Sequence, residues 1–224
     1  MNFEEWNERM FKKHGAFEKR YMKGNAFLRH IELQRIRTVL KILNSSSKGS
    51  VLDVGCGDGT LIKKIKGKKI VGIDASKTAV KIARENLRGK RNVVIKRMNA
   101  ERLDLPTESF DRIVCTEVLE HVQKPGDVIS EMLRVLKKDG YAVITIPNEK
   151  NVKKIKNSLK RLGMMNVFLD GISKDCSEEW HIHEFSREMF KKLAEKKFRI
   201  EKTKAIPNFL VPIWFMFKCK PIKQ

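Results

Sequence analysis

The chain has 224 residues and a formal net charge of +21, from 48 Lys and Arg residues against 27 Asp and Glu residues. At 41% hydrophobic residues it can bury a sizeable core, which excludes wholesale disorder, and its length fits one domain with appendages. The positive charge is spread over the whole length. It therefore suggests an anionic partner without marking a dedicated nucleic-acid-binding patch.

The cysteines and the N-terminus indicate where the protein resides. The N-terminal segment is polar and carries no apolar signal core. The longest apolar run, Phe209–Phe217, is about half of the ~20 residues that a membrane-spanning helix needs, and it contains Pro212. We therefore expect a soluble, cytoplasmic protein. Wide spacing without a CxxC pair disfavours a zinc ribbon or a disulfide scaffold for the four cysteines, Cys56, Cys115, Cys176 and Cys219.

The first 148 residues divide into a helical part and an alternating part. Apolar residues from Leu28 to Leu43 recur at helical spacing, so residues 1–44 are predicted to form a helical N-terminal cap. Short apolar runs then alternate with amphipathic stretches, which predicts a parallel sheet with right-handed crossovers over residues 45–148. The predicted strands are Val51–Val54, Lys69–Ile73, Val93–Lys96, Phe110–Cys115 and Tyr141–Ile146. The predicted helices are Thr60–Lys66, Lys77–Leu87 with Ser76 as its N-cap, and Val128–Leu136.

The composition changes after Pro147. We expect a basic helix over Asn151–Leu162, a loop over Gly163–Glu184 and a helix from Ser186 to Lys197. A loop of this length is usually functional, so residues 149–185 are predicted to be a lid or substrate segment. Residues 186–224 would complete the same domain with strands at Phe198–Thr203 and Pro212–Lys220. We interpret Phe209–Phe217 as the buried last strand, and the alternative is an apolar lip, with Trp214 and Phe215, that docks on a lipid or membrane.

A glycine-rich loop follows the first predicted strand. Residues 51–59 read VLDVGCGDG, with glycines at 55, 57 and 59. Glycine permits positive φ and lets a ligand approach the backbone, as in nucleotide-binding turns between a strand and a helix. Asp53 lies at the carboxyl end of this strand. Asp74 ends the next strand about 20 residues downstream, where an acid can take two ribose hydroxyls.

These residues resemble the class I S-adenosylmethionine (SAM) dependent methyltransferases. VLDVGCGDG and VGIDAS, residues 71–76, are similar to motifs I and II of that family. Met98–Pro106 resembles the stretch that contacts the adenine. Asp111–His121 and Glu131–Gly140 resemble motif IV and the helix-turn before strand five. The resemblance covers residues 27–148 closely, and it implies a Rossmann-like, seven-stranded, mostly parallel sheet with helices on both faces and an antiparallel last strand.

The resemblance also implies a site for SAM. Asp53 would orient the methionine amino group, Asp74 would bind the ribose, and Asn99 with Ala100 would contact the adenine. Position 99 is Asn where the family often has Asp, and Asn can still accept a hydrogen bond through its carbonyl oxygen. The implied cofactor-binding residues are Asp53, Gly55, Cys56, Gly57, Asp74, Ala75, Asn99, Ala100, Glu101 and Thr116.

Carboxylates and histidines gather in two later segments. On a helix, Glu117, Glu120 and His121 would share one face, beyond the end of strand four and beside the cofactor's methyl group. Further along, His181 and His183 alternate, so they would point to the same side if the backbone is extended. Such groups could hold a divalent cation, or they could supply a general base for a hydroxyl acceptor.

This cluster resembles that of two different groups of methyltransferases. EVLEHV, residues 117–122, followed by a His-containing segment, looks like the ubiquinone-biosynthesis O-methyltransferases. It also looks like the small-RNA 3′-terminal 2′-O-methyltransferases, in which a matching Glu-x-x-Glu-His and a distant His bind a divalent metal. Helix capping and packing without a metal would explain the same residues. We expect His121, His183 and Glu117 to be catalytic, and the candidates for a metal that the sequence leaves open are Glu117, Glu120, His121 and His181.

The sequence thus predicts a SAM-dependent methyltransferase that methylates a small-molecule or lipid-like acceptor, most simply at an oxygen. The Asn/Asp-Pro-Pro-Tyr/Phe tetrapeptide does not follow strand four, where Cys115-Thr-Glu-Val stands, and this disfavours methylation of base amino groups. The alternatives are an RNA ribose 2′-O-methyltransferase with a divalent metal, a carbon methyltransferase acting on an activated ring, and a SAM-binding regulator without turnover. The positive charge fits an anionic acceptor or a peripheral membrane contact.

Overall fold

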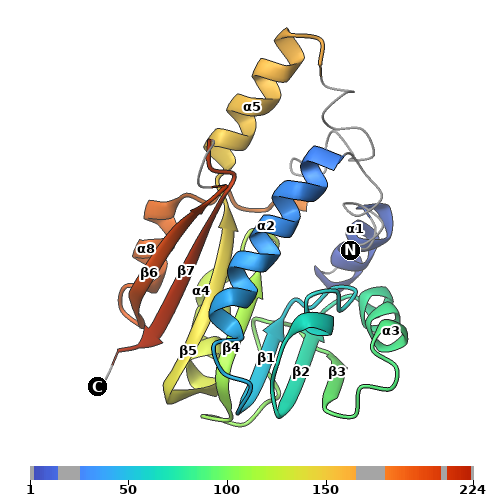
Figure 1. Cartoon of the computed structure of the whole chain (residues 1–224), viewed down its shortest axis with the longest axis vertical. Coiled ribbons are helices and arrows are strands. Elements are labelled where there is room, and N and C mark those ends of the chain that lie inside the picture. The colour runs from blue at the N-terminus through green and yellow to red at the C-terminus, as the bar shows by residue number, and fades with distance from the viewer. Residues whose placement is uncertain (1–2, 15–25, 165–179, 208–210, 223–224) are drawn as a thin grey trace.

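The computed structural model describes residues 3–14, 26–164, 180–207 and 211–222 (Figure 1). The strands are β1 (Ser50–Val54), β2 (Lys69–Asp74), β3 (Val93–Arg97), β4 (Phe110–Thr116), β5 (Leu136–Pro147), β6 (Phe198–Ile206) and β7 (Trp214–Pro221). The helices are α1 (Phe3–His14), α2 (Ala26–Leu43), α3 (Lys77–Asn86), α4 (Pro125–Val135), α5 (Glu149–Arg161) and α8 (Arg187–Ala194), with a short 3-10 helix, η2, at Ile62–Lys64.

The seven strands form one sheet in the order β3-β2-β1-β4-β5-β7-β6. The first five are parallel to one another, and β7 runs antiparallel between β5 and β6. This is the mostly parallel, Rossmann-like, seven-stranded sheet with an antiparallel last strand that the family resemblance implies. Because the sheet is parallel, the carboxyl ends of β1, β2, β4 and β5 meet at one edge, where ligands of open α/β sheets bind.

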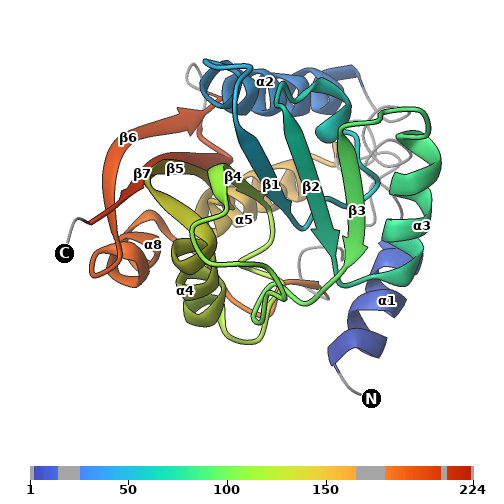
Figure 2. The same cartoon turned by 90° about the horizontal axis from the view of Figure 1, so that it is seen from below.

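Apolar runs form the central strands because both faces of the sheet are covered. Helices α2 and α3 lie over one face and α4 and α8 over the other, which Figure 2 shows from below. The two cores are built accordingly. Ile31, Val39 and Leu43 of α2 pack with β1 and β2 on one side, and Met132 of α4 and Phe190 of α8 belong to the opposite core.

The predicted helix Thr60–Lys66 is wrong. Only the three residues of η2 are helical there, with backbone hydrogen bonds from Lys64 N–H to Leu61 O and from Ile65 N–H to Ile62 O. The chain must enter β2 at Lys69, which leaves too few residues for a longer α-helix. Ser76 does cap α3 as predicted, because its side chain accepts a hydrogen bond from Ala79 N–H.

The C-terminal apolar segment is a strand and not a surface lip from Trp214 onward. Trp214, Met216 and Phe217 are buried in β7, between β5 and β6. Residues 208–210 and most of the predicted loop, residues 165–179, lie outside the described part of the chain. Within that described part, no helix is both long and apolar enough to cross a membrane. Cys56, Cys115 and Cys219 are buried with free thiols, and Cys176 lies outside the described residues.

Candidate functional site

The glycine loop begins directly after β1. Gly55, Gly57 and Gly59 all have positive φ, at 71°, 53° and 77°. A Cβ atom at Gly55 would lie 2.3 Å from Val118 Cγ2, and one at Gly59 would lie 2.7 Å from Leu87 Cδ1. At Gly57 a Cβ atom would meet nothing within 4 Å. Two of the glycines therefore allow close packing within the protein, whereas Gly57 borders open space in which a ligand can approach the backbone.

Asp53 is a buried carboxylate at the end of β1. Its side chain is 1% exposed, and neither oxygen has a hydrogen-bond partner among the described residues. Burial raises the pKa of Asp53 well above its usual value, and the charge of Asp74 raises it further. A buried polar group without a partner is costly, so such a carboxylate suits a site where a positively charged ligand group completes it.

Asp74 ties the glycine loop to the start of α3. Its two carboxylate oxygens accept hydrogen bonds from Gly57 N–H and Ser76 N–H, both at 2.9 Å. Burial raises the pKa of Asp74 to about 6, although the two backbone hydrogen bonds act in the opposite direction. Each carboxylate oxygen can accept a further bond, so the hydroxyls of a ribose could still be bound here.

The segment predicted to contact adenine lies against the end of β2. Met98 N–H donates to Asp74 O at 3.0 Å, and Asn99 Oδ1 accepts from Glu101 N–H at 2.9 Å. Ala100 is buried. The Glu101 carboxylate accepts from the N–H groups of residues 123 and 124, just before α4. The predicted set is thus gathered at one edge of the sheet, with Cys56 in the loop, Ala75 after β2 and Thr116 ending β4.

The helix predicted across Glu117, Glu120 and His121 is wrong. Residues 117–121 form bends and turns, because Glu117 takes a φ of 55° that no right-handed helix contains. The Glu117 carboxylate turns toward the neighbouring strands. It accepts from Thr145 Oγ1 at 2.9 Å and from Trp214 Nε1 at 2.7 Å. The Glu117 carboxylate therefore binds Thr145 and Trp214 and does not share one face with Glu120 and His121.

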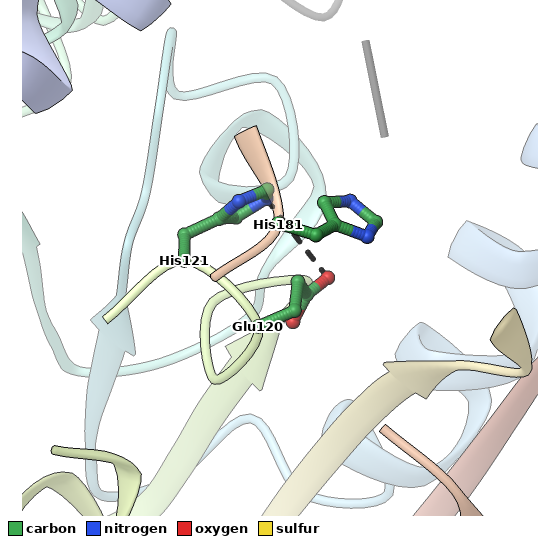
Figure 3. A group of neighbouring side chains, drawn as sticks. All are labelled: Glu120, His121 and His181. Carbon is green, nitrogen blue, oxygen red and sulfur yellow. Dashed lines mark ion pairs between the residues drawn. The ribbon is translucent and has the colours of Figure 1, made fainter. Parts of the chain in front are cut away.

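Glu120, His121 and His181 form a compact group beyond the end of β4 (Figure 3). Each offers one ligand atom, and these atoms all lie within 4.8 Å of one another. Glu120 is fully buried, and neither carboxylate oxygen has a hydrogen-bond partner among the described residues. Glu120 Oε1 lies 4.0 Å from His121 Nε2. Burial, followed by the charge of Glu117, raises the pKa of Glu120 well above its usual value.

The backbone of segment 180–184 is hydrogen-bonded to this group. Ile182 N–H donates to Glu120 O at 2.7 Å, and Trp180 O lies 3.0 Å from His121 Nδ1. The Trp180 ring also packs against the His121 ring, with centroids 4.6 Å apart. The second histidine of the group, His181, pairs through Nδ1 with Glu149 Oε1 in the first turn of α5.

His183 lies apart from the group. Segment 181–185 is bent and not extended, so His181 and His183 do not share a side as predicted. His183 Nε2 instead lies 3.2 Å from Gln123 O. Sequence reasoning missed Glu149, Thr145 and Trp214. Glu149 gave no signal beyond being an acid in the first turn of a basic helix, and the other two are ordinary strand residues.

Comparison with known sequences identifies the central part of the chain. Residues 52–144 match the family model described as a methyltransferase domain. The ubiquinone biosynthesis O-methyltransferase of Alkalilimnicola ehrlichii is 32% identical over 125 residues, which cover 54% of this chain and 51% of that protein. The enzyme of the same name from Hahella chejuensis is 41% identical over 91 residues, covering 39% and 38%. The chain spans about half the length of the first relative and less of the second.

Solved structures share the fold over nearly the whole chain. N-methyltransferase NodS from Bradyrhizobium japonicum, in complex with S-adenosyl-L-homocysteine, superimposes with a TM-score of 0.71 at 15% identity, covering 97% of this chain and 99% of that one. A SAM-dependent methyltransferase from Aquifex aeolicus gives a TM-score of 0.64 at 19% identity, covering 96% and 97%. Residues 52–144 are therefore similar to a methyltransferase domain, and the chain shares the fold of these solved structures.

Proposed function

We propose that this protein is a SAM-dependent methyltransferase that methylates a hydroxyl group of a small acceptor. The observation that carries the proposal is the buried Asp53 carboxylate, which has no hydrogen-bond partner among the described residues and precedes a glycine loop with open space at Gly57. A buried carboxylate at that point suits a ligand with a positive charge, and SAM carries an ammonium group and a sulfonium group. The name of the sequence relatives supports oxygen as the acceptor atom.

The proposed roles of the loop residues follow from their positions. When bound, SAM supplies a methyl group on a positively charged sulfur, which is intrinsically reactive. The protein's contribution is therefore mainly alignment. Asp53 would hold the ammonium group, Asp74 would accept from the ribose hydroxyls, and Asn99 with Ala100 would contact the adenine. Gly57 leaves the space that this contact with the backbone requires.

A hydroxyl acceptor also needs a group that takes up its proton. Of the three residues predicted to be catalytic, His121 is the one best supported, because it lies beside Glu120 with its ring oriented by Trp180 O. The Glu117 carboxylate is already bound by two donors, and His183 faces Gln123 O. We therefore assign the proton-accepting role to His121.

A second arrangement of the same group includes a divalent cation. The specific observation in its favour is Glu120, whose buried carboxylate has no described hydrogen-bond partner and lies with two histidines. Glu120, His121 and His181 would hold the cation. A cation bound there would lower the pKa of an acceptor hydroxyl. Activity that survives EDTA, with no metal found by elemental analysis, would leave His121 as a base and remove the cation.

The decisive experiment supplies labelled SAM with cell extract fractionated into small molecules, lipids and RNA. We expect the label in the small-molecule or lipid fraction, with one S-adenosylhomocysteine formed per methyl group transferred. Label in the RNA fraction, with steep salt dependence of binding, would instead identify an RNA ribose methyltransferase. SAM binding with no S-adenosylhomocysteine formed in any fraction would identify a regulator. Transfer that is unaffected by His121→Ala would favour a carbon acceptor.

A further inference from the structure

Glu117, the carboxylate that the sequence places first in the cluster, is already used within the protein. Its two oxygens accept separate hydrogen bonds, from Thr145 Oγ1 in β5 and from Trp214 Nε1 in β7. Its φ of 55° fixes the backbone in the left-handed region, which a residue other than glycine adopts only where its surroundings enforce it. Moving this side chain toward the histidines would leave the buried Trp214 Nε1 without its acceptor.

Glu149 is the carboxylate that contacts His181. It is 6% exposed, and its Oε1 pairs with Nδ1 of His181, which belongs to the group of Glu120, His121 and His181. Residues before and after Glu149 in the chain hold it in place by hydrogen bonds. The side-chain amides of Asn148 and Asn151 donate to Pro212 O, at 3.1 and 2.9 Å. The start of α5 is thus held where Glu149 meets the group.

The charges around the group leave a place for a cation. Glu120 is fully buried, and neither of its carboxylate oxygens has a hydrogen-bond partner among the described residues. The guanidinium of the buried Arg35 is paired with Glu32 at 2.9 Å. Binding a metal ion requires ionised carboxylates and neutral imidazoles, and in that state Glu120 and Glu149 would carry the charge that one divalent ion neutralises.

We propose that Glu149, and not Glu117, is the second carboxylate of a divalent-cation site whose ligands are Glu120, His121 and His181. Glu149 acts as a positioning residue, because its contact with Nδ1 of His181 holds that ring and leaves Nε2 for the ion. This inference rests on the cation proposed above. Two imidazole nitrogens and one carboxylate oxygen favour a borderline transition-metal ion such as Mn²⁺, Co²⁺ or Zn²⁺ over Mg²⁺, which prefers oxygen ligands and retains its water. The first turn of α5 thereby becomes part of the site.

The test measures cation binding directly, in the full-length protein without SAM. The EDTA-treated protein is titrated with Co²⁺ and separately with Mg²⁺ by calorimetry, and the visible spectrum of bound Co²⁺ is recorded. The variants are Glu149→Gln, Glu120→Gln and Glu117→Gln. Glu184→Gln is the matched control, since Glu184 is exposed on segment 180–184 and pairs with Lys153. Thermal unfolding of each variant establishes that it is folded.

We expect Co²⁺ to bind the wild-type protein more tightly than Mg²⁺. Glu149→Gln and Glu120→Gln should each weaken Co²⁺ binding by ~10-fold or more and change the Co²⁺ spectrum, as losses around metal sites do. Glu117→Gln and Glu184→Gln should leave the Co²⁺ dissociation constant within about threefold of the wild-type value and the spectrum unchanged, because changes outside a site have small effects on it.

Three results would overturn the inference. The first is a larger loss in Glu117→Gln than in Glu149→Gln, and the second is unchanged Co²⁺ affinity and spectrum in Glu149→Gln. The third is a wild-type protein that binds no divalent cation at all. SAM binding is measured separately in the EDTA-treated protein. If SAM binds but no cation does, this inference fails and the proposed methyltransferase stands, whereas absence of SAM binding contradicts the proposed function itself.

Discussion

Asp53 and Asp74 are two carboxylates in one loop region whose surroundings differ. Asp74 already accepts two backbone hydrogen bonds, whereas Asp53 has no described partner. Burial raises the pKa of both groups. The difference follows from position, since Asp74 lies where the loop and the start of α3 both present N–H groups. Asp53 lies in β1 just before the glycine loop, where no described donor reaches its carboxylate oxygens.

SAM affinity should depend on pH through Asp74. Its pKa of about 6 in the folded protein lies above the usual 3.8, so the group is protonated at mildly acidic pH. Only the ionised form accepts from both ribose hydroxyls, and the dissociation constant for SAM should therefore rise as pH falls through about 6. Calorimetry between about pH 5 and 8 measures this. Asp74→Asn should flatten the dependence near pH 6, and Asp74→Ala should raise the dissociation constant at least ~10-fold. Unchanged affinity in Asp74→Ala would refute the assignment.

Gly55 and Gly57 should respond differently to alanine, although both have positive φ. Gly57→Ala places a methyl group in open space, so it should weaken SAM binding while lowering the free energy of unfolding by only about 1 kcal/mol for the backbone strain. Gly55→Ala places its Cβ atom against Val118 and should destabilise the protein by more. Denaturant unfolding and SAM titration of both variants separate the two effects. Equal losses of stability would contradict the assignment.

At the scale of elements, Glu8 of helix α1 binds the start of helix α3, beside an apolar contact of Met10 and Phe11 with Ala79. Glu8 accepts hydrogen bonds from Ser76 Oγ, Thr78 N–H and Thr78 Oγ1, at the N-terminus of α3. The Met10 and Phe11 side chains pack in the same small core as Trp180. Helix α1 thus contacts both the start of α3 and the segment that carries His181, and it lies over this side of the site.

Removing the charge of Glu8 should loosen this attachment. Although burial acts to raise it, hydrogen bonds from Thr78 and Ser76 lower the pKa of Glu8 from 4.5 to about 2. A lowered pKa in the folded state stabilises the protein above pH 4.5, and that stabilisation is lost as pH falls toward 2. Glu8→Gln should therefore lower the free energy of unfolding near neutral pH. It should also reduce the decline between about pH 5 and 2, measured by urea denaturation. An identical pH profile in the variant would exclude this role.

Elements with a strong local pattern were predictable, and those set by tertiary demands were not. Strands β1, β2 and β4 follow from buried apolar runs, and the start of α3 follows from Ser76 as its N-cap. The helix at Thr60–Lys66 fails because the next strand begins too soon. The helix through Glu117 fails because Thr145 and Trp214 hold that residue in a conformation which its sequence does not indicate.

The site shows the same limit at the scale of the whole molecule. The residues near the glycine loop could be predicted because they lie on β1 and β2, which are close in sequence and pair with each other. Glu149 follows Glu120 by 29 residues, and His181 follows Glu149 by another 32 residues. Only folding brings these residues near one another, and sequence spacing carries no information over such separations. Figure 1 shows α5 extending from the end of the sheet near this edge, an arrangement that periodicity in the sequence alone does not predict.

The net charge of +21 should make the folded state sensitive to salt. Self-repulsion among like charges opposes the compact state, and salt screens it over about 10 Å at 0.1 M. Raising NaCl from a low concentration to about 0.3 M should therefore raise Tm by a few degrees, equivalent to about 1 kcal/mol. Calorimetry in NaCl and KCl checks the effect, which should be the same in both. A falling Tm would mean that attractive ion pairs outweigh the repulsion.

The buried cysteines give the protein its own reporters of opening. Iodoacetamide modifies a thiol only when it is exposed and ionised, and burial raises the pKa of Cys56 and Cys115 well above the usual value. Cys56 lies in the glycine loop, while Cys115 and Cys219 lie inside β4 and β7. The alkylation rate of each thiol, resolved by mass spectrometry, therefore reports how often that part of the protein opens. A ligand that closes the loop should slow modification at Cys56 alone, whereas unfolding of the sheet exposes all three together.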